Sequence, residues 1–179
     1  MIDKLIEDIN KALDSEAYLA ALSLALTLPD ICGKAEFPSA GCGRRYIDWY
    51  DEHIGQYEHP PFKEDEPKLP YLSGEVVFQL RCSMLHQGTP NINPQNIKDP
   101  ICRIDRFELV IEKKNALDIY TDFSARSKDY WNGQLSNEKR TYKVSVRRLC
   151  FILCTCAQSY YDKNKEKFNF FNYTITNYD

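Results

Sequence analysis

Two side chains near the middle of the sequence, Arg81 and His86, combine a permanent cation with a group that exchanges protons near neutral pH. Cleavage of RNA through its ribose 2′-hydroxyl needs such groups. A base takes the hydroxyl proton, an acid protonates the leaving 5′-oxygen, and a cation stabilises the charge on the phosphorane. No metal or other cofactor is required. The pair is therefore a candidate for metal-independent RNA cleavage, with His86 in proton transfer and Arg81 on the scissile phosphate.

The surrounding residues predict a helix over 73–87 that positions this pair. Ser73 is a suitable N-cap, because its hydroxyl can accept a hydrogen bond from a free backbone N–H of the first turn. Gly88 is a suitable stop, because glycine enters the left-handed conformation without strain. Apolar residues recur between them at helical spacing and predict one buried face: Val76, Val77, Leu80 and Met84.

An Arg-x4-His pattern at the end of a helix resembles the R-x4-6-H motif of the HEPN superfamily, helical-bundle proteins that include many metal-independent ribonucleases. The resemblance covers the helical parts of the chain and not the residues from about 101 to 140. It implies a single HEPN-like domain over residues 1–179 and a homodimer whose cleft holds the motifs of both chains. In active members the residue after the arginine is commonly polar, whereas here it is Cys82.

Three functions are compatible with these residues. The first is a metal-independent endoribonuclease, as the toxin of a stress or phage-defence system with an antitoxin partner. The second is a non-catalytic HEPN-like module that binds a nucleotide, RNA or a protein, which Cys82 and the net charge of −3 favour. The third is a structural domain in which Arg81 pairs with an interior acid and His86 caps the helix end.

One chain offers a single histidine beside such an arginine. The others, His53 and His59, fall at the end of another predicted helix and in a proline-rich loop. Cleavage needs both an acid and a base. A twofold homodimer that joins two Arg81–His86 pairs would supply both, so we expect a homodimer with this helix near its axis.

Several polar residues are expected to support the pair. Asp30 lies in an apolar setting, and an unpaired buried carboxylate is costly. It therefore either braces backbone N–H groups near Pro29 or orients Arg81 or His86. Two neighbours along the same helix can add hydrogen bonds: Ser83 and Gln87.

RNA contact must use a local basic patch, because a net charge of −3 provides no global basic field. The start of the helix predicted over 44–57, together with the preceding loop, carries the candidate RNA-binding cations: Arg44, Arg45 and Lys34.

Length and composition are those of one globular domain. The chain has 179 residues, 43% of them hydrophobic and 27% charged. The longest apolar run, residues 17–28, is shorter than the roughly 20 residues that span a bilayer, so no membrane association is expected.

The acidic N-terminus lacks the apolar region of a signal peptide, and the seven cysteines have no framework spacing. Reduced thiols and a cytoplasmic location are expected.

The thiols do not predict a metal centre. Cys154 and Cys156 would lie about 200° apart on one helix, so they cannot converge on an ion with Cys150. A mixed site of Cys32 and Cys42 with His53 or His59 is the weaker alternative, since no closely spaced ligand pair supports it.

Periodic apolar residues predict a mainly α fold, a bundle of four or five helices over 2–13, 15–28, 44–57, 73–87 and 144–165. Pro29 is expected to kink or end the second helix. A small β-hairpin insertion, over about 101–143, is expected before the last long helix. In it, a strand over 107–112 would pair with residues 116–123, residues 124–139 would form a loop, and a strand would start at Thr141.

Overall fold

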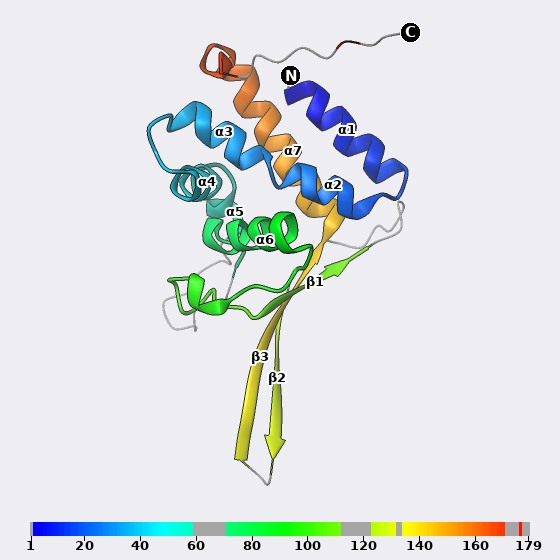
Figure 1. Cartoon of the computed structure of the whole chain (residues 1–179), viewed down its shortest axis with the longest axis vertical. Coiled ribbons are helices and arrows are strands. Elements are labelled where there is room, and N and C mark those ends of the chain that lie inside the picture. The colour runs from blue at the N-terminus through cyan, green and yellow to red at the C-terminus, as the bar shows by residue number, and fades with distance from the viewer. Residues whose placement is uncertain (1, 59–70, 112–122, 132–133, 171–175, 177–179) are drawn as a thin grey trace.

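The computed structural model describes residues 2–58, 71–111, 123–131, 134–170 and 176, with the backbone alone for 123–131 and 134–139. The fold is mainly helical, as predicted, with a small sheet below the helices (Figure 1). The main helices are α1 (Ile2–Asp14), α2 (Tyr18–Ala25), α3 (Leu28–Glu36), α4 (Cys42–Tyr50), α6 (Gly74–Gln87) and α7 (Val146–Lys163). Short helical segments are the π-helix Asp51–Gly55, α5 (Gln56–Glu58) and the 3-10 turns Pro94–Asn96 and Lys165–Phe168.

The single helix predicted over 15–28 is wrong, because this part of the chain forms two helices. α2 ends at Ala25, and Pro29 lies in the first turn of α3. Proline is tolerated there because the first N–H groups of a helix have no intrahelical acceptor. Pro29 therefore helps to start a helix that continues to Glu36, into residues expected to form a loop.

The helix predicted over 44–57 begins at Cys42 and continues through the π-helix into α5. Tyr46 and Tyr50 lie on its inner face and are 0% exposed. Tyr57 would share that face in a continuous α-helix, but it is 78% exposed. A π-helical turn has more residues per turn than an α-helix, so it rotates the residues that follow out of the α-helical register.

The sheet has three strands in the order β1-β3-β2. β1 (Arg106–Val110) pairs in parallel with the end of β3 (Gln134–Ser145), while β2 (Phe123–Trp131) pairs antiparallel with β3. A hairpin does precede α7, but residues expected as a loop form it. The predicted partner of the first strand lies almost wholly outside the described residues.

Burial explains the parallel pairing. β1 and the end of β3 bring Phe107, Tyr142 and Val144 into the core, where each is at most 5% exposed. The rings of Phe107 and Tyr142 lie 6.2 Å apart. Residues 124–139 lack this apolar alternation, and for that reason the sequence pattern favoured a loop.

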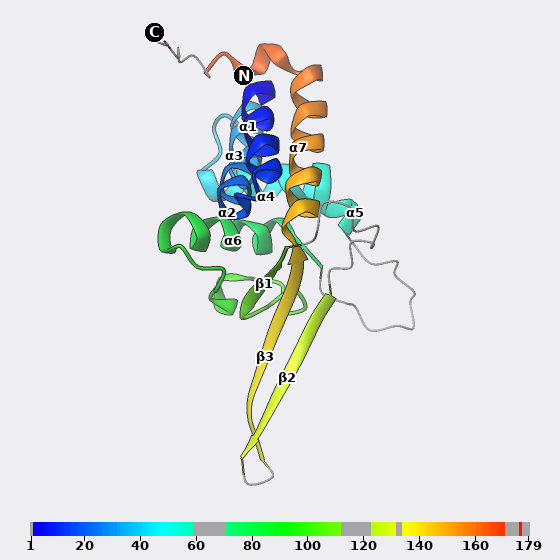
Figure 2. The same cartoon turned by 90° about the vertical axis from the view of Figure 1, so that its right-hand side faces the viewer.

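α6 has the predicted boundaries. The Ser73 hydroxyl accepts a hydrogen bond from the Val76 N–H, and Gly88 adopts the left-handed conformation with φ of 65°. The helix runs across the lower end of the bundle, near the sheet (Figures 1 and 2). No helix within the described ranges is both long and apolar enough to cross a membrane.

Candidate functional site

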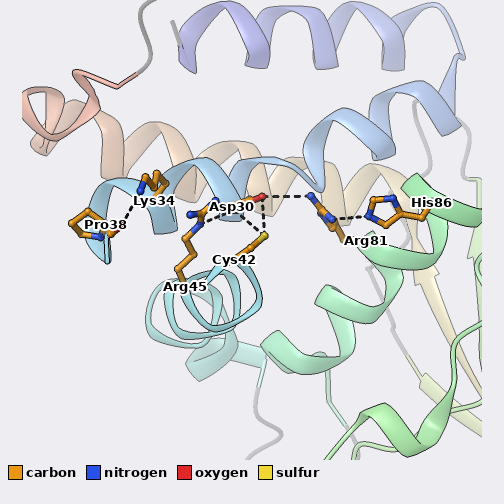
Figure 3. A network of polar contacts seen from close by, with 7 residues as sticks. All are labelled: Asp30, Lys34, Pro38, Cys42, Arg45, Arg81 and His86. Carbon is orange, nitrogen blue, oxygen red and sulfur yellow. Dashed lines mark hydrogen bonds and ion pairs between the residues drawn. The ribbon is translucent and has the colours of Figure 1, made fainter. Parts of the chain in front are cut away.

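Asp30 is the centre of a polar network between three helices (Figure 3). Its Oδ1 accepts from Arg45 Nε of α4 at 2.9 Å and lies 2.8 Å from Arg45 Nη2. Its Oδ2 accepts from Arg81 Nη2 of α6 at 3.4 Å. The three side chains are between 17% and 20% exposed, so water only partly screens their charges. One carboxylate therefore holds two guanidinium groups, which leaves a net positive charge at the edge of the bundle.

Arg81 also reaches His86. Its Nη1 lies 3.2 Å from His86 Nε2. Arginine can only donate, so in this hydrogen bond Nε2 accepts and carries no proton. The imidazole is then neutral with its proton on Nδ1. A helix ordinarily separates residues five apart by about 140°, but here the long Arg81 side chain reaches the His86 ring (Figure 3).

Cys42, which sequence reasoning considered only for a metal site, belongs to this network, and the buried Tyr46 experiences its charge. Cys42 Sγ donates to Asp30 Oδ2 at 3.4 Å, and burial followed by the nearby Asp30 charge raises the pKa of this thiol. In this network the thiol is a hydrogen-bond donor. Tyr46 lies on the inner face of α4. It is buried, and burial raises its pKa well above the usual range while the Arg81 charge opposes that rise.

Tyr46 and Arg81 each contain a covered polar atom. Tyr46 Oη and Arg81 Nε have no hydrogen-bond partner among the described residues. The guanidinium of Arg81 therefore uses one terminal nitrogen for Asp30 and the other for His86. No local sequence pattern could have indicated Tyr46, because an aromatic residue on the inner face of a helix is usually core.

The two supporting residues on α6 lie elsewhere. Ser83 and Gln87 line a depression of about 350 Å³ on α6, together with Gln79, Cys82, Asn91, Ile92, Asn93 and Asn96. Arg81 and His86 are not among its lining residues. The structure therefore brings Asp30 to Arg81, but places Ser83 and Gln87 around a separate polar depression.

The predicted RNA-binding cations differ in their surroundings. Arg45 is part of the network. Arg44 is exposed and pairs with Asp48 one turn along α4. Lys34 donates to the carbonyl of Pro38 at 2.8 Å (Figure 3). All three lie on α3 and α4, but Arg44 and Arg45 are each paired with a carboxylate.

No group of three or more metal-binding side chains is found in the part of the chain that the structure describes. All seven cysteines, which lie within it, are free thiols. Cys32, one ligand of the weaker metal hypothesis, is fully buried, and burial raises its pKa.

Comparisons of the chain with family models, with curated proteins and with solved structures find no match.

Proposed function

We propose that this protein is a metal-independent endoribonuclease whose catalytic residues are Arg81 and His86. The contact of 3.2 Å between Arg81 Nη1 and His86 Nε2 carries the proposal, because it joins a phosphate-binding cation to a neutral imidazole. Asp30 supports it by fixing the other side of the guanidinium. His86 is exposed, so a substrate can reach it.

The geometry suggests how binding would prepare the base. In the free protein, Arg81 occupies the lone pair of His86 Nε2. A phosphate group is a better acceptor for guanidinium, since the hydrogen bonds are charge-assisted and can be bidentate. When the scissile phosphate takes the Arg81 Nη1 donor, His86 Nε2 becomes free to accept a proton from the ribose 2′-hydroxyl. Substrate binding and base activation are then one event.

Bond changes follow from this arrangement. The 2′-oxygen attacks phosphorus as His86 takes its proton, and the bond to the 5′-oxygen breaks as a second, protonated imidazole donates to it. The products are a 2′,3′-cyclic phosphate and a 5′-hydroxyl. Arg81 stabilises the charge that peaks in the phosphorane.

We propose that the second imidazole is His86 of another copy in a twofold homodimer. His53, the other histidine within the described ranges, lies in an aromatic cluster on the π-helix. Leu85, directly before His86, is 37% exposed and offers an apolar surface beside the site. Light scattering at micromolar concentration should give twice the mass of the 20.9 kDa chain. A monomer mass would contradict this assembly.

A non-catalytic module that binds RNA, nucleotide or protein is the second candidate. It is favoured by one observation: Arg45 and Arg81 already share the carboxylate of Asp30, which weakens the local field that a phosphate would meet. In that case Arg81 would bind the ligand and His86 would transfer no proton.

The test uses a panel of labelled single-stranded RNAs in EDTA with wild-type protein, His86→Ala, Arg81→Ala and Arg81→Lys. Loss of a proton-transfer group costs roughly 10²–10⁴-fold in rate. We expect His86→Ala to show no detectable cleavage, and both arginine variants to lose most of it, since lysine lacks the fork. Equal cleavage by wild type and His86→Ala would show contamination. Binding without cleavage, lost in Arg81→Ala, would favour the second candidate.

We propose a cytoplasmic toxin of a stress or phage-defence system, held inactive by an antitoxin partner, as the setting of this activity. Unregulated cleavage of RNA would arrest growth. Induced expression of wild type should therefore stop growth in a bacterial host, whereas His86→Ala at the same protein level should not. Equal growth in both strains would contradict the toxin role.

A further inference from the structure

The distal part of the β2–β3 ribbon projects from the bundle as a two-stranded arm (Figures 1 and 2). Residues 141–145 of β3 pair with β1 and belong to the body of the sheet. Before residue 141, β3 pairs with β2 alone. We define the arm as residues 126–131 and 134–140. At about 3.4 Å per residue, six residues of β2 extend the ribbon by roughly 20 Å.

Charge is distributed unevenly between the arm and the rest of the chain. The arm contains four basic residues (Arg126, Lys128, Lys139 and Arg140) and two acidic residues (Asp129 and Glu138), a net charge of +2. The whole chain carries −3, so all other residues together carry −5. A basic element on an acidic body attracts polyanions to itself and not to the molecule as a whole.

Strand register gives the arrangement of these cations. Arg126 lies opposite Arg140 and Lys128 opposite Glu138, so these four share one face of the ribbon. Lys139, opposite Ser127, lies on the other face.

The base of the arm is fixed by one of these arginines. Arg140 Nη1 donates to the carbonyls of Pro100, Ile101 and Arg103 at 3.0 to 3.2 Å. Its N–H donates to Asp105 Oδ2 at 2.7 Å. Arg140 therefore ties the ribbon to the loop below α6, and the other cations, Arg126, Lys128 and Lys139, are the candidates for contact with a partner.

The distal end of the arm is aromatic. Tyr130 pairs with Leu135 and Trp131 with Gln134, beyond a bulge after Asp129. The rest of the arm is polar in sequence, so it provides no apolar face of its own for a core. Cations along a ribbon that ends in two aromatic residues are typical of surfaces that track the backbone of a single strand and stack its bases.

We propose that this arm binds single-stranded RNA. Arg126, Lys128 and Lys139 contact phosphates, and Tyr130 and Trp131 stack on bases. The proposal rests on the proposed function only for the identity of the ligand. We choose single-stranded over double-stranded RNA as the ligand, because side chains cannot enter the deep, narrow major groove of an RNA duplex.

The experiment measures binding of a fluorescein-labelled, mixed-sequence 20-nucleotide RNA in a His86→Ala background, so that cleavage does not interfere. Arg126→Ala, Lys128→Ala and Lys139→Ala are combined. The matched control removes three exposed cations from the opposite end of the molecule: Lys4→Ala, Lys11→Ala and Lys165→Ala. Both changes lower the net charge equally, and circular dichroism checks that both proteins remain folded.

We expect the arm variant to bind about tenfold or more weakly at 0.1 M salt, with the control close to wild type. Each lost phosphate contact lowers the dependence of log K on log salt by about 0.7, so the slope should fall by about 2. A variant that keeps Arg126 and carries Lys128→Arg and Lys139→Arg retains the charges, so its affinity and its salt slope should match those of the protein with an unchanged arm. Trp131→Ala should weaken binding by about tenfold with an unchanged slope, because stacking releases no counterions.

Failures of the two proposals are distinguishable. Equal losses in the arm and control variants, or tighter binding of a duplex of the same sequence, would overturn the arm proposal even if the wild type cleaves RNA. Arm-dependent binding by a wild-type protein that cuts no RNA would overturn the ribonuclease and leave the arm in place.

Discussion

The two histidines that the structure describes lie in opposite environments. His86 is exposed at the end of α6, where its Nε2 accepts from Arg81. His53 lies in the π-helix between aromatic rings, 4.9 Å from Trp49 and 5.2 Å from Tyr160. Its Nε2 is covered and has no partner within the described ranges, and burial lowers its pKa below the ordinary 6.5.

A carboxylate and a cation accompany each histidine, yet in only one of the two sets does the cation contact the described imidazole. Asp30 holds Arg81, which in turn contacts His86. Glu36 accepts from Lys167 and Tyr160, and these bonds lower its pKa, but no described cation contacts the imidazole of His53. The same residue types therefore place one imidazole in contact with a guanidinium at the surface and the other among aromatic rings.

The largest expected effect is a difference in RNA cleavage rate between substitutions of the two histidines. His86→Gln should lower the cleavage rate by roughly 10²–10⁴-fold, because glutamine cannot transfer the proton. His53→Gln should change the rate less than about threefold, since it lies outside the network. The measurement is single-turnover cleavage of one labelled RNA. A larger loss in His53→Gln than in His86→Gln would reverse the assignment.

A backbone contact beside Asp30 should give the largest effect on stability. An added Cβ at Gly33 would lie 2.4 Å from the backbone oxygen of Arg45, so Gly33→Ala must push α3 away from α4. Overpacking of this kind costs about 3 kcal/mol. Urea denaturation should detect it. Gly41→Ala is the control, because no atom lies within 4 Å of its Cβ position. Equal stability of the two variants would contradict the close approach.

Removing the charge of Asp30 should lower stability more than removing the charge of Glu36. Asp30→Asn leaves two partly buried guanidinium groups without their anion and should lower the free energy of unfolding by about 2 kcal/mol. Glu36→Gln, at a more exposed pair, should cost less than about 1 kcal/mol. Denaturant melts of both variants test this order. A larger loss for Glu36→Gln would show that Asp30 is not the main anchor.

The smallest expected effect concerns pH. Because the pKa of His53 is lowered on folding, the unfolded chain binds more protons as pH falls below 6.5, and stability is lost on acidification between 6.5 and the lowered pKa. His53→Phe keeps a ring and removes a covered polar atom. It should flatten this part of the stability profile without lowering stability at pH 8. An unchanged slope would show that other groups cause the pH dependence.

Several features could be predicted from the sequence because their causes are local. The bounds of α6 depend on Ser73, Gly88 and the residues between them, so the cap, the stop and the late position of Arg81 and His86 were all predicted and confirmed. The ion pair of Asp30 with Arg81 was one of two predicted alternatives, since a carboxylate in an apolar setting requires a partner.

Tertiary structure decided the rest, because its causes join distant residues. Arg45 reaches Asp30 where α3 and α4 approach closely at Gly33, and α4 packs on α6 through Tyr46 and Phe78, whose rings lie 5.2 Å apart. Pairing of β1 with β3 depends on a segment 35 residues further along the chain, where Arg140 bonds to Asp105. The sequence separates His86 from His53 by its spacing from Arg81, but only the structure shows that His53 Nε2 is covered while His86 is exposed.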